Sequence, residues 1–594
     1  MFKQWLKTHN TADYTYTGRL FPDTTDRAYW DAYTDPRFIT EAERYLGYNW
    51  PIIRATDFME FKRSGNRTIM ETPHFARRRA LISLAIAEVM ENKGRFLPEL
   101  VNGLFLICEE SYWGLSAHWQ AEVGNIPTPE HPYIDLFAAQ TAEELALTYY
   151  LLYAPLNSCC PEILERIEYE MNRRIFVPYL DHRDYWWMGY GLKRTNNWNP
   201  WIISNVMLAF FLVERNPRRV ETAVYKMLIE LQNYYDTMPA DGGCDEGASY
   251  WGVAGLSLFE CVYQLKTATD GAIDLLGDEK LRNILAYVEK VYIGNGKFIN
   301  FADGPTGGPG RIGEMIYLIG RETGQPRLMG LGRALYDPSA DPAVNYWEKM
   351  RRKLLAIPLR RELETAPAYS PANFACLPDL QVCALRRGGW FLGAKGGNNA
   401  EHHNHNDIAN FILYDNGAPV LIDAGVGDYT RQTFSSERYT IWTMQSSYHN
   451  LPDLGGVAQH NGSKYRADSF TCGEDNVSIG FASAYPAEAG VERAERTIEL
   501  TDAGITVRDS FAFAGETPAI TEHLMTALEP AIDGSTVTLG GRYVIDCGGG
   551  AVSVDKVEFA GNAKLQGSWQ QTYLWRVNVE FAGCTEIKLT VRRI

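Results

Sequence analysis

The hydrophobic pattern of the chain changes its period near residue 370, and this change constrains the fold more than any other feature. Before it, segments such as 77–94 place apolar residues three and four positions apart, which is typical of helices that bury one face. After it, segments such as 410–425 are rich in β-branched residues, alternate with period two and end at turn signals. We therefore predict a helical domain over residues 1–370 and an antiparallel β domain, arranged as a sandwich, over residues 371–594.

The length of the chain supports this division. A chain of 594 residues exceeds what one hydrophobic core usually serves, so at least two domains are expected. No short sequence repeat is evident in the helical part, which favours a closed toroid or bundle of antiparallel helices over a solenoid of identical units.

The acidic balance of the chain excludes one class of partner. The formal net charge is −16, so we expect no nucleic-acid partner, whose binding depends on neutralising phosphates. No stretch approaches the roughly 20 apolar residues of a membrane helix, and the first residues lack the apolar run of a signal peptide. We therefore expect no membrane partner and a cytoplasmic location. A homo-oligomer is compatible with the sequence.

The cysteines carry no recognisable site. Ten are present, and none forms a C-x-x-C pair. This spacing indicates neither a thiolate zinc site nor a redox motif, and a reducing compartment fits it best.

The densest group of polar residues lies between positions 401 and 450. It comprises the run EHHNHND, the segment LIDAG with Asp423 and the segment SSYHN with His449. If the chain near His403 is strand-like, His403 and His405 point to the same face, so one can act on a substrate while the other binds a metal. Asp423 and His449 would complete a set of two histidines and one aspartate, which suits zinc. The alternative is an ordinary solvated loop.

A second group of polar residues precedes an apolar helix. Asn196, Asn197 and Trp198 combine neutral hydrogen-bonding groups with an indole, as a sugar ring with a carboxylate requires. The alternative is local capping: Asn199 would cap a helix that begins at Pro200. Capping by Asn199 leaves Asn196 and Asn197 unexplained.

A third group, DGGCDEGASYW, is a glycine-rich turn that ends in carboxylates and an aromatic pair. Tyr250 in this group can transfer protons if nearby positive charge lowers its pKa from about 10. An ordinary helix entry is one alternative. Another is that Asp245 or Glu246 serves as the acid of a glycosidase, although adjacent residues seldom face one sugar from opposite sides.

Together these three groups resemble the heparinase II/III-like family of polysaccharide lyases, which also includes alginate and oligoalginate lyases. The resemblance covers both halves of the chain, and its most specific part is the run HNHND with the segments LIDAG and SYHN. It implies an (α/α) toroid followed by an antiparallel β-sandwich, with the site in the groove between them. It also implies β-elimination: removal of the C5 proton of a uronic acid, loss of the 4-linked sugar and formation of a C4–C5 double bond.

The resemblance assigns a role to each matching residue. Asn197 would neutralise the uronate carboxylate. Tyr250 would protonate the leaving oxygen and, in syn elimination, would also take the C5 proton, whereas His403 would act as base in anti elimination or bind the carboxylate. Trp198 departs from the family pattern, since several relatives have a histidine at this position. The zinc ligands, which would have a structural role, would be His405, Asp423 and His449.

The remaining expected substrate contacts are Asn196, Trp198, Glu246, Arg194 and Arg438. The two arginines are chosen because a guanidinium forms a planar fork for carboxylates or sulfates. The sequence thus predicts a lyase acting on an acidic oligosaccharide or polysaccharide. The alternatives are a glycoside hydrolase on the same toroid and a glycan-binding protein with a structural zinc.

Overall fold

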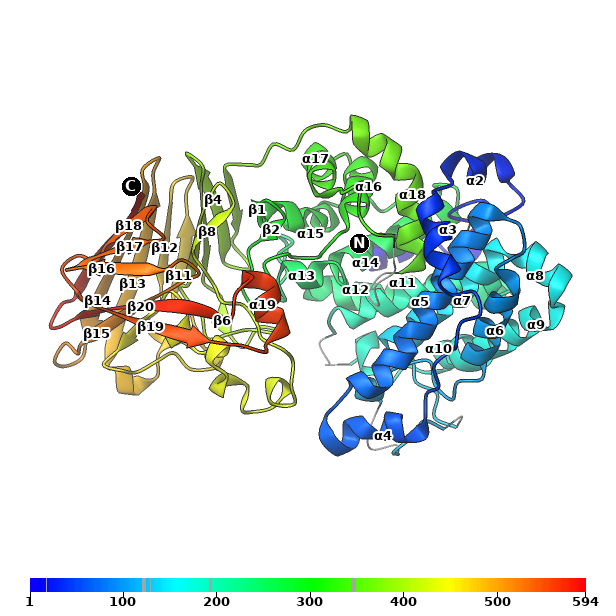
Figure 1. Ribbon diagram of the computed structural model, residues 1–594, viewed down its shortest axis with the longest axis horizontal. Helices are drawn as coiled ribbons and strands as arrows, with labels where there is room; N and C mark the ends of the chain where they lie inside the picture. Colours follow the sequence, from blue (N-terminus) through cyan, green and yellow to red (C-terminus); the bar gives the residue numbers. More distant parts are fainter. Residues whose placement is uncertain (18, 120–123, 129, 192–194, 343–348) are drawn as a thin grey trace. The chain divides into compact units, whose positions relative to one another are not determined.

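The computed structural model describes residues 1–594 except 18, 120–123, 129, 192–194 and 343–348 (Figure 1). These residues form two compact units. The helical unit comprises 1–237, 253–279 and 311–369, and the β unit comprises 238–252, 280–310 and 370–594. The chain therefore passes between the units at several points, of which the boundary predicted near residue 370 is the last.

The helical unit consists of helices joined by turns and by loops of differing length. A π-helical turn, Asn172–Phe176, joins α9 to α10. The helices are α1 (Phe2–Leu6), α2 (Arg27–Tyr33), α3 (Pro36–Glu43), α4 (Ala55–Ser64), α5 (Thr68–Glu91), α6 (Leu97–Cys108), α7 (Leu136–Leu151), α8 (Tyr153–Cys159), α9 (Pro161–Met171), α10 (Val177–Asp181), α11 (Trp198–Val213), α12 (Pro217–Thr237), α14 (Gly255–Ala268), α16 (Gly313–Thr323), α17 (Pro326–Leu335) and α18 (Met350–Thr365).

The inner helices of this unit are buried on nearly every side. In α11 almost every residue is buried, and the helix packs against α7, α12 and α14. A helix that is apolar all round belongs in the interior of its domain. Asp135 fixes the start of α7, because its carboxylate accepts hydrogen bonds from the backbone N–H groups of Phe137 and Ala138.

The β unit contains three large sheets, and each of them is antiparallel throughout. Their strand orders are β11-β12-β13-β14-β21-β18-β17-β16, β19-β20-β15-β9 and β3-β4-β5-β7-β8. The strands are β3 (Phe374–Leu377), β4 (Val382–Arg387), β5 (Trp390–Lys395), β7 (Phe411–Asp415), β8 (Ala418–Leu421), β9 (Pro452–Leu454), β11 (Ser469–Cys472), β12 (Asn476–Gly480), β13 (Val491–Leu500), β14 (Gly504–Phe513), β15 (Ile520–Thr526), β16 (Pro530–Asp533), β17 (Thr536–Leu539), β18 (Tyr543–Asp546), β19 (Ala551–Glu558), β20 (Tyr573–Phe581) and β21 (Glu586–Arg593).

Smaller elements complete the β unit. Two strand pairs lie outside the large sheets: β1 (Tyr292–Gly294) with β2 (Lys297–Phe298), and β6 (Asn398–Asn399) with β10 (Gly462–Arg466). The segments contributed from the first part of the chain carry the helices α13 (Ala248–Trp251) and α15 (Glu279–Lys290), and a third helix, α19 (Ala563–Trp569), lies near the end of the chain.

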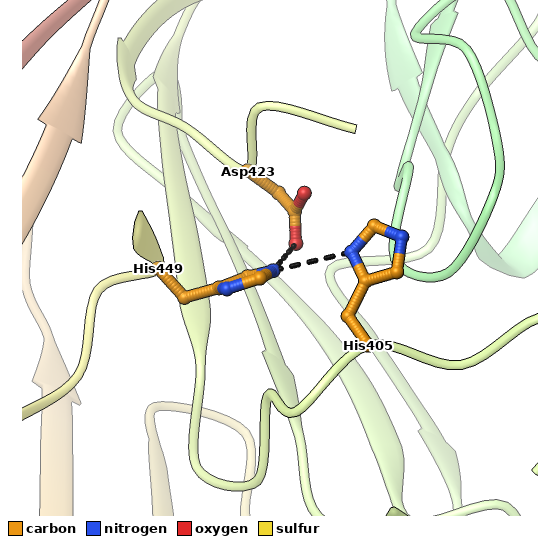
Figure 2. A group of neighbouring side chains, drawn as sticks. All are labelled: His405, Asp423 and His449. Atoms are coloured by element: carbon orange, nitrogen blue, oxygen red, sulfur yellow. Dashed lines mark hydrogen bonds and ion pairs between the residues drawn. The ribbon is translucent and has the colours of Figure 1, made fainter. Parts of the chain in front are cut away.

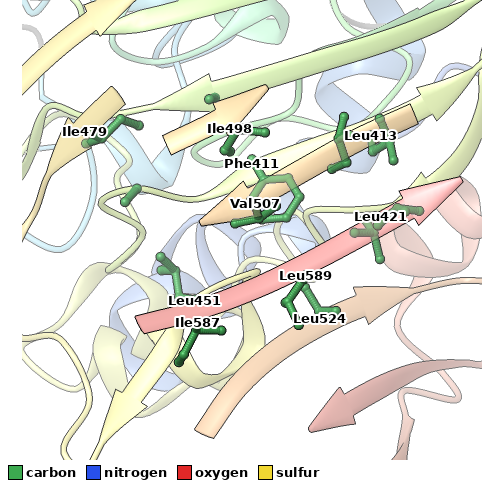
Figure 3. Packing of buried hydrophobic residues seen from close by; sticks show 14 of the residues in the cluster. Phe411, Leu413, Leu421, Leu451, Ile479, Ile498, Val507, Leu524, Ile587 and Leu589 are labelled. Atoms are coloured by element: carbon green, nitrogen blue, oxygen red, sulfur yellow. The ribbon is translucent and has the colours of Figure 1, made fainter. Parts of the chain in front are cut away.

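One hydrophobic core joins the three large sheets (Figure 3). Leu413 of the five-stranded sheet, Ile498 and Val507 of the eight-stranded sheet, and Leu524 of the four-stranded sheet all belong to it. In β13 and β21 buried residues alternate with more exposed ones, as expected of strands with one face on a core. The sequence prediction of an antiparallel β-sandwich is confirmed.

A buried arginine interrupts this apolar core. Arg496 of β13 pairs with Asp509 of β14 and with Glu522 of β15, at 2.6 Å in each case. Its guanidinium also donates to the backbone oxygens of Ala409 (3.1 Å) and Asn450 (2.6 Å). Arg496 thus connects the strands of two sheets to the loops that precede β7 and β9.

A disulfide bond joins Cys376 of β3 to Cys472 of β11. The sequence analysis did not anticipate this pair, because it favoured a reducing compartment, where disulfides are rare. The two residues lie 96 positions apart, so cysteine spacing alone did not reveal their proximity.

Among the described residues, no helix is both long enough and apolar enough to cross a membrane.

Candidate functional site

The loop between β6 and β7 carries the two histidines that the sequence placed on one strand face. The chain here forms turns, and His403 has a left-handed backbone with φ of 56°. The strand-like arrangement is therefore wrong. The loop is held from beneath by Lys395, whose ammonium lies 2.7 Å from Asp407 Oδ1 and whose backbone oxygen accepts from Ala409 N.

Asp303, a residue that the sequence analysis did not select, brings the two histidines together. Oδ2 accepts from His403 Nδ1 at 2.9 Å and from the Tyr429 hydroxyl at 3.2 Å. Oδ1 accepts from His405 Nε2 at 3.2 Å and from Arg438 Nη2 at 2.6 Å. Burial alone would raise the pKa of Asp303, but the hydrogen bonds from His403 and His405 hold it well below its usual range. The carboxylate is therefore ionised.

Tyr250 lies against His403. Their rings stack with centroids 4.5 Å apart and planes inclined by 24°, and the Tyr250 hydroxyl lies 3.0 Å from that of Tyr429. Because Tyr429 donates its one proton to Asp303, Tyr250 must donate to Tyr429. Burial raises the pKa of Tyr250. The expected lowering by positive charge is therefore wrong, and Tyr250 is a protonated phenol at neutral pH.

Glu246 lies at the edge of the same cluster. Its Oε2 is 4.0 Å from His403 Nε2, and its side chain is buried. His403 is the more accessible partner, with 22% of its side chain exposed. The structure thus brings together three residues of the prediction, Glu246, Tyr250 and His403.

The three predicted metal ligands also converge (Figure 2). His405 Nδ1 lies 3.2 Å from His449 Nε2, which in turn lies 3.5 Å from Asp423 Oδ2. All three ligand atoms lie within 4.8 Å of one another, and the side chains are fully buried.

Hydrogen bonds from outside this group fix which atoms face its centre. His405 donates from Nε2 to Asp303, and His449 donates from Nδ1 to the backbone oxygen of Gln445 at 2.9 Å. The remaining ring nitrogens therefore direct lone pairs at each other. Asn410 Nδ2 donates to Asp423 Oδ2 at 2.9 Å. Two lone pairs and a carboxylate in contact repel unless a cation lies among them, and this donor set fits Zn²⁺.

The predicted residues that are described in the helical unit lie at the start of α11. Asn196 Oδ1 accepts from the backbone N–H of Trp198 at 3.1 Å, so local capping does explain Asn196. Asn197 is buried at the start of the helix, and the Trp198 ring lies 4.7 Å from that of His118. Arg194 lies outside the described residues.

Asn199 does not cap a helix. It lies inside α11, which begins two residues before Pro200, and its amide donates to the backbone oxygens of Trp187 (3.0 Å) and Glu230 (3.1 Å). The proline misled the sequence analysis, because it occupies a first-turn position without being the first helical residue.

Arg438 is engaged by the protein itself. Besides Asp303, its guanidinium donates to the backbone oxygens of His403, Asn404 and Thr433 at 3.1–3.3 Å. Only 11% of its side chain is exposed. In this structure Arg438 therefore holds Asp303 and the histidine loop in place.

The sequence of the β unit matches a known family. Residues 371–569 match the family described as heparinase II/III-like, C-terminal. These residues form a heparinase II/III-like domain. The domain supplies His403, Arg438 and the three candidate metal ligands, whereas Tyr250 and Asp303 come from segments that precede it in the chain. No curated protein matches the sequence.

Solved structures resemble the whole chain, including its heparinase II/III-like domain. A heparan sulfate lyase HepC mutant from Pedobacter heparinus is 13% identical with a TM-score of 0.60, and the match covers 100% of this chain and 87% of the lyase chain. Heparinase III is 12% identical with a TM-score of 0.66, and the match covers 100% of this chain and 88% of the heparinase chain. A chondroitin AC lyase from Streptomyces coelicolor A3 is 11% identical with a TM-score of 0.52, covering 96% and 82%. The likeness confirms the expected fold class, a helical toroid followed by an antiparallel β-sandwich.

Proposed function

We propose that the protein is a polysaccharide lyase that cleaves uronate-containing glycans by β-elimination. The observation that carries the proposal is the stacked pair Tyr250 and His403, in which His403 belongs to the heparinase II/III-like domain and is hydrogen-bonded to Asp303. A protonated phenol and an oriented imidazole are the acid and the base that this reaction requires.

We assign the two proton transfers as follows. Because Asp303 holds the proton on His403 Nδ1, the lone pair of His403 resides on Nε2, which takes the C5 proton of the uronate. As the C5–H bond breaks, the C4–C5 double bond forms and the C4–O bond breaks. The Tyr250 hydroxyl turns from Tyr429 to the leaving oxygen and gives it a proton.

The uronate carboxylate must be neutralised before its C5 proton becomes acidic enough. We assign this task to Asn197, on the resemblance of the segment NNW to the family pattern. An amide can donate to one carboxylate oxygen without adding charge. Asn196, Trp198, Glu246, Arg194 and Arg438 stay predictions as substrate contacts.

We propose that His405, Asp423 and His449 are the ligands of a zinc ion. When bound, the ion would neutralise the buried carboxylate and lock together the loops that carry these residues, which is a structural role. The substrate is an acidic oligosaccharide or polysaccharide. The cytoplasmic location and a homo-oligomer stay predictions.

The test is the ultraviolet absorbance of the conjugated uronate product during incubation with a panel of uronate glycans. We expect a rise with at least one glycan, and its loss in Tyr250→Phe. A flat trace while chromatography detects shortened chains would indicate hydrolysis instead. Saturable glycan binding without any product would indicate a binding protein.

A further inference from the structure

We propose that Asp303 is the positioning residue that sets the tautomers of two histidines with different tasks, so that metal binding and proton abstraction depend on one carboxylate. The role of His403 as base rests on the proposed function, whereas the role of His405 as metal ligand does not require it. Asp303 is neither a proposed metal ligand nor a proposed substrate contact. It acts through its neighbours.

The two oxygens of Asp303 serve different sides of the site. Oδ2 accepts from His403 and from Tyr429, which leads to Tyr250. Oδ1 accepts from His405 and from Arg438. The base and the acid are thus anchored to one oxygen, and the metal group to the other.

Each hydrogen bond determines which ring nitrogen is available. His403 donates from Nδ1, which leaves the lone pair on Nε2, the ring nitrogen that lies 4.0 Å from Glu246 Oε2. His405 donates from Nε2, which leaves the Nδ1 lone pair facing His449 and Asp423. The two histidines therefore hold opposite tautomers, and one acceptor imposes both.

Only an acceptor that carries no proton can receive a hydrogen bond from both His403 and His405 and so impose both tautomers. The side chain of Asp303 is fully buried and receives four donors. An asparagine in its place would direct an NH₂ group at one side, so that one imidazole would have to accept rather than donate. That imidazole would then present an N–H, either to the substrate or to the metal.

The backbone around Asp303 is tied to the metal group as well. Asn300 Nδ2 donates to the backbone oxygen of Asp423 at 3.0 Å. The preceding residue, Ala302, has a left-handed backbone with φ of 66°, which turns the chain sharply before Asp303. The position of the carboxylate is thus set by the segment that contacts a metal ligand.

The experiment compares Asp303→Asn with the wild-type chain and with Asp415→Asn. Asp415 is a matched control, because its carboxylate pairs with Arg593 at 2.6 Å and belongs to the same unit but contacts neither histidine. Three quantities are measured: zinc affinity by competition with a chromogenic chelator, ring-nitrogen tautomers by NMR of ¹⁵N-histidine-labelled protein, and kcat and KM. His403→Gln and His405→Gln assign the NMR signals.

We expect Asp303→Asn to lower zinc affinity by about 10–100-fold, or to lower kcat by at least as much with little change in KM, and to change the tautomer of at least one histidine. Asp415→Asn should leave all three quantities unchanged. Wild-type tautomers at both histidines in folded Asp303→Asn would overturn the proposal. If Asp303→Asn does not fold, wild-type protein in which His403 lacks an Nδ1 proton or His405 lacks an Nε2 proton would overturn it.

The two proposals fail in different ways. If no uronate glycan is cleaved, the function proposed above is wrong, while zinc affinity and the His405 tautomer still test Asp303. If cleavage is found but Asp303→Asn retains both tautomers and wild-type kcat, the function stands and the positioning role is wrong.

Discussion

The phenol ring of Tyr250 stacks on the imidazole of His403, with ring centroids 4.5 Å apart. The two residues are 153 positions apart in the chain, and they meet because the segment 238–252 belongs to the β unit. Stacking keeps the two rings at a fixed spacing. In the proposed reaction, a single sugar residue would present its C5 hydrogen to His403 and its C4 oxygen to Tyr250.

Replacing Tyr250 by phenylalanine should lower kcat by about 10²–10⁴-fold, because the leaving oxygen would lose its acid. KM and thermal stability should change little, since the hydroxyl's one described bond is to Tyr429. The rate of unsaturated product formation measures this effect. Tyr429→Phe serves as the comparison and should cause a smaller loss. Near-normal turnover in Tyr250→Phe would exclude it as the acid.

Replacing His403 by glutamine should abolish detectable elimination while preserving zinc content, because His403 is not in the metal group. His460→Gln is the matched control, since His460 is exposed and lies outside the proposed site. Elemental analysis and product formation together check the prediction. Loss of zinc in His403→Gln would show that the two histidines cannot be assigned separate tasks.

Removal of zinc by a chelator should lower the melting temperature. A ligand present at about 100 times its Kd stabilises the folded state by roughly 2.7 kcal/mol, and the apo site leaves two ring lone pairs 3.2 Å apart. Thermal unfolding with and without chelator measures the shift. His449→Ala should melt at the same temperature under both conditions. An equal response in this variant would place the stabilising metal elsewhere.

Replacing Arg496 by methionine should destabilise the β unit by about 3–5 kcal/mol, because Asp509 and Glu522 would be left as unpaired buried carboxyl groups. Arg508→Met is the control: its pair with Glu499 spans 3.7 Å at the surface, so less than about 1 kcal/mol is expected. Urea unfolding measures both changes. Equal effects would contradict the importance of the buried network.

Glu144 should contribute to the stability of the folded chain at low pH, and this contribution should fall as pH rises from about 4.5 to about 8. Burial raises its pKa to about 8, from a model-peptide value of 4.5, although Arg78 opposes the shift. The folded state therefore holds a proton that the unfolded state has released, and stability should decrease by up to about 1.4 kcal/mol per pH unit between these values. In Glu144→Gln this slope should be shallower. Parallel stability curves from urea unfolding at pH 5–8.5 would contradict the assignment.

The fold class could be predicted because it depends on periodicity. Strands such as β13 and β14 carry period two clearly, and α9 and α12 carry helical spacing clearly. The assignment of 280–310 to the β unit could not be predicted in the same way. This segment begins with α15, which has an ordinary amphipathic pattern, and only its contacts distinguish it from the other helices.

In the candidate site too, residues marked by their local sequence could be predicted, whereas a residue that reaches the site only through the fold could not. His405 and His449 could be found because they stand in polar runs, and Asp423 could be found because it is an isolated carboxylate directly after an apolar segment. Asp303 could not, because it stands alone in a glycine-rich and proline-rich loop and meets His403 across 100 positions. The pKa of Tyr250 was also beyond prediction, since its direction depends on burial that only the folded chain reveals.

The way the chain passes repeatedly between its two units restricts how this site could be inherited. A gene fragment that starts at Ser370 encodes all three candidate metal ligands, yet it lacks both Tyr250 and Asp303. A single recombination event at that boundary would transfer the candidate metal ligands without the proposed acid and without the carboxylate that contacts the proposed base. The acid and that carboxylate are encoded among the helices but fold with the sheets, so the two units have to evolve together.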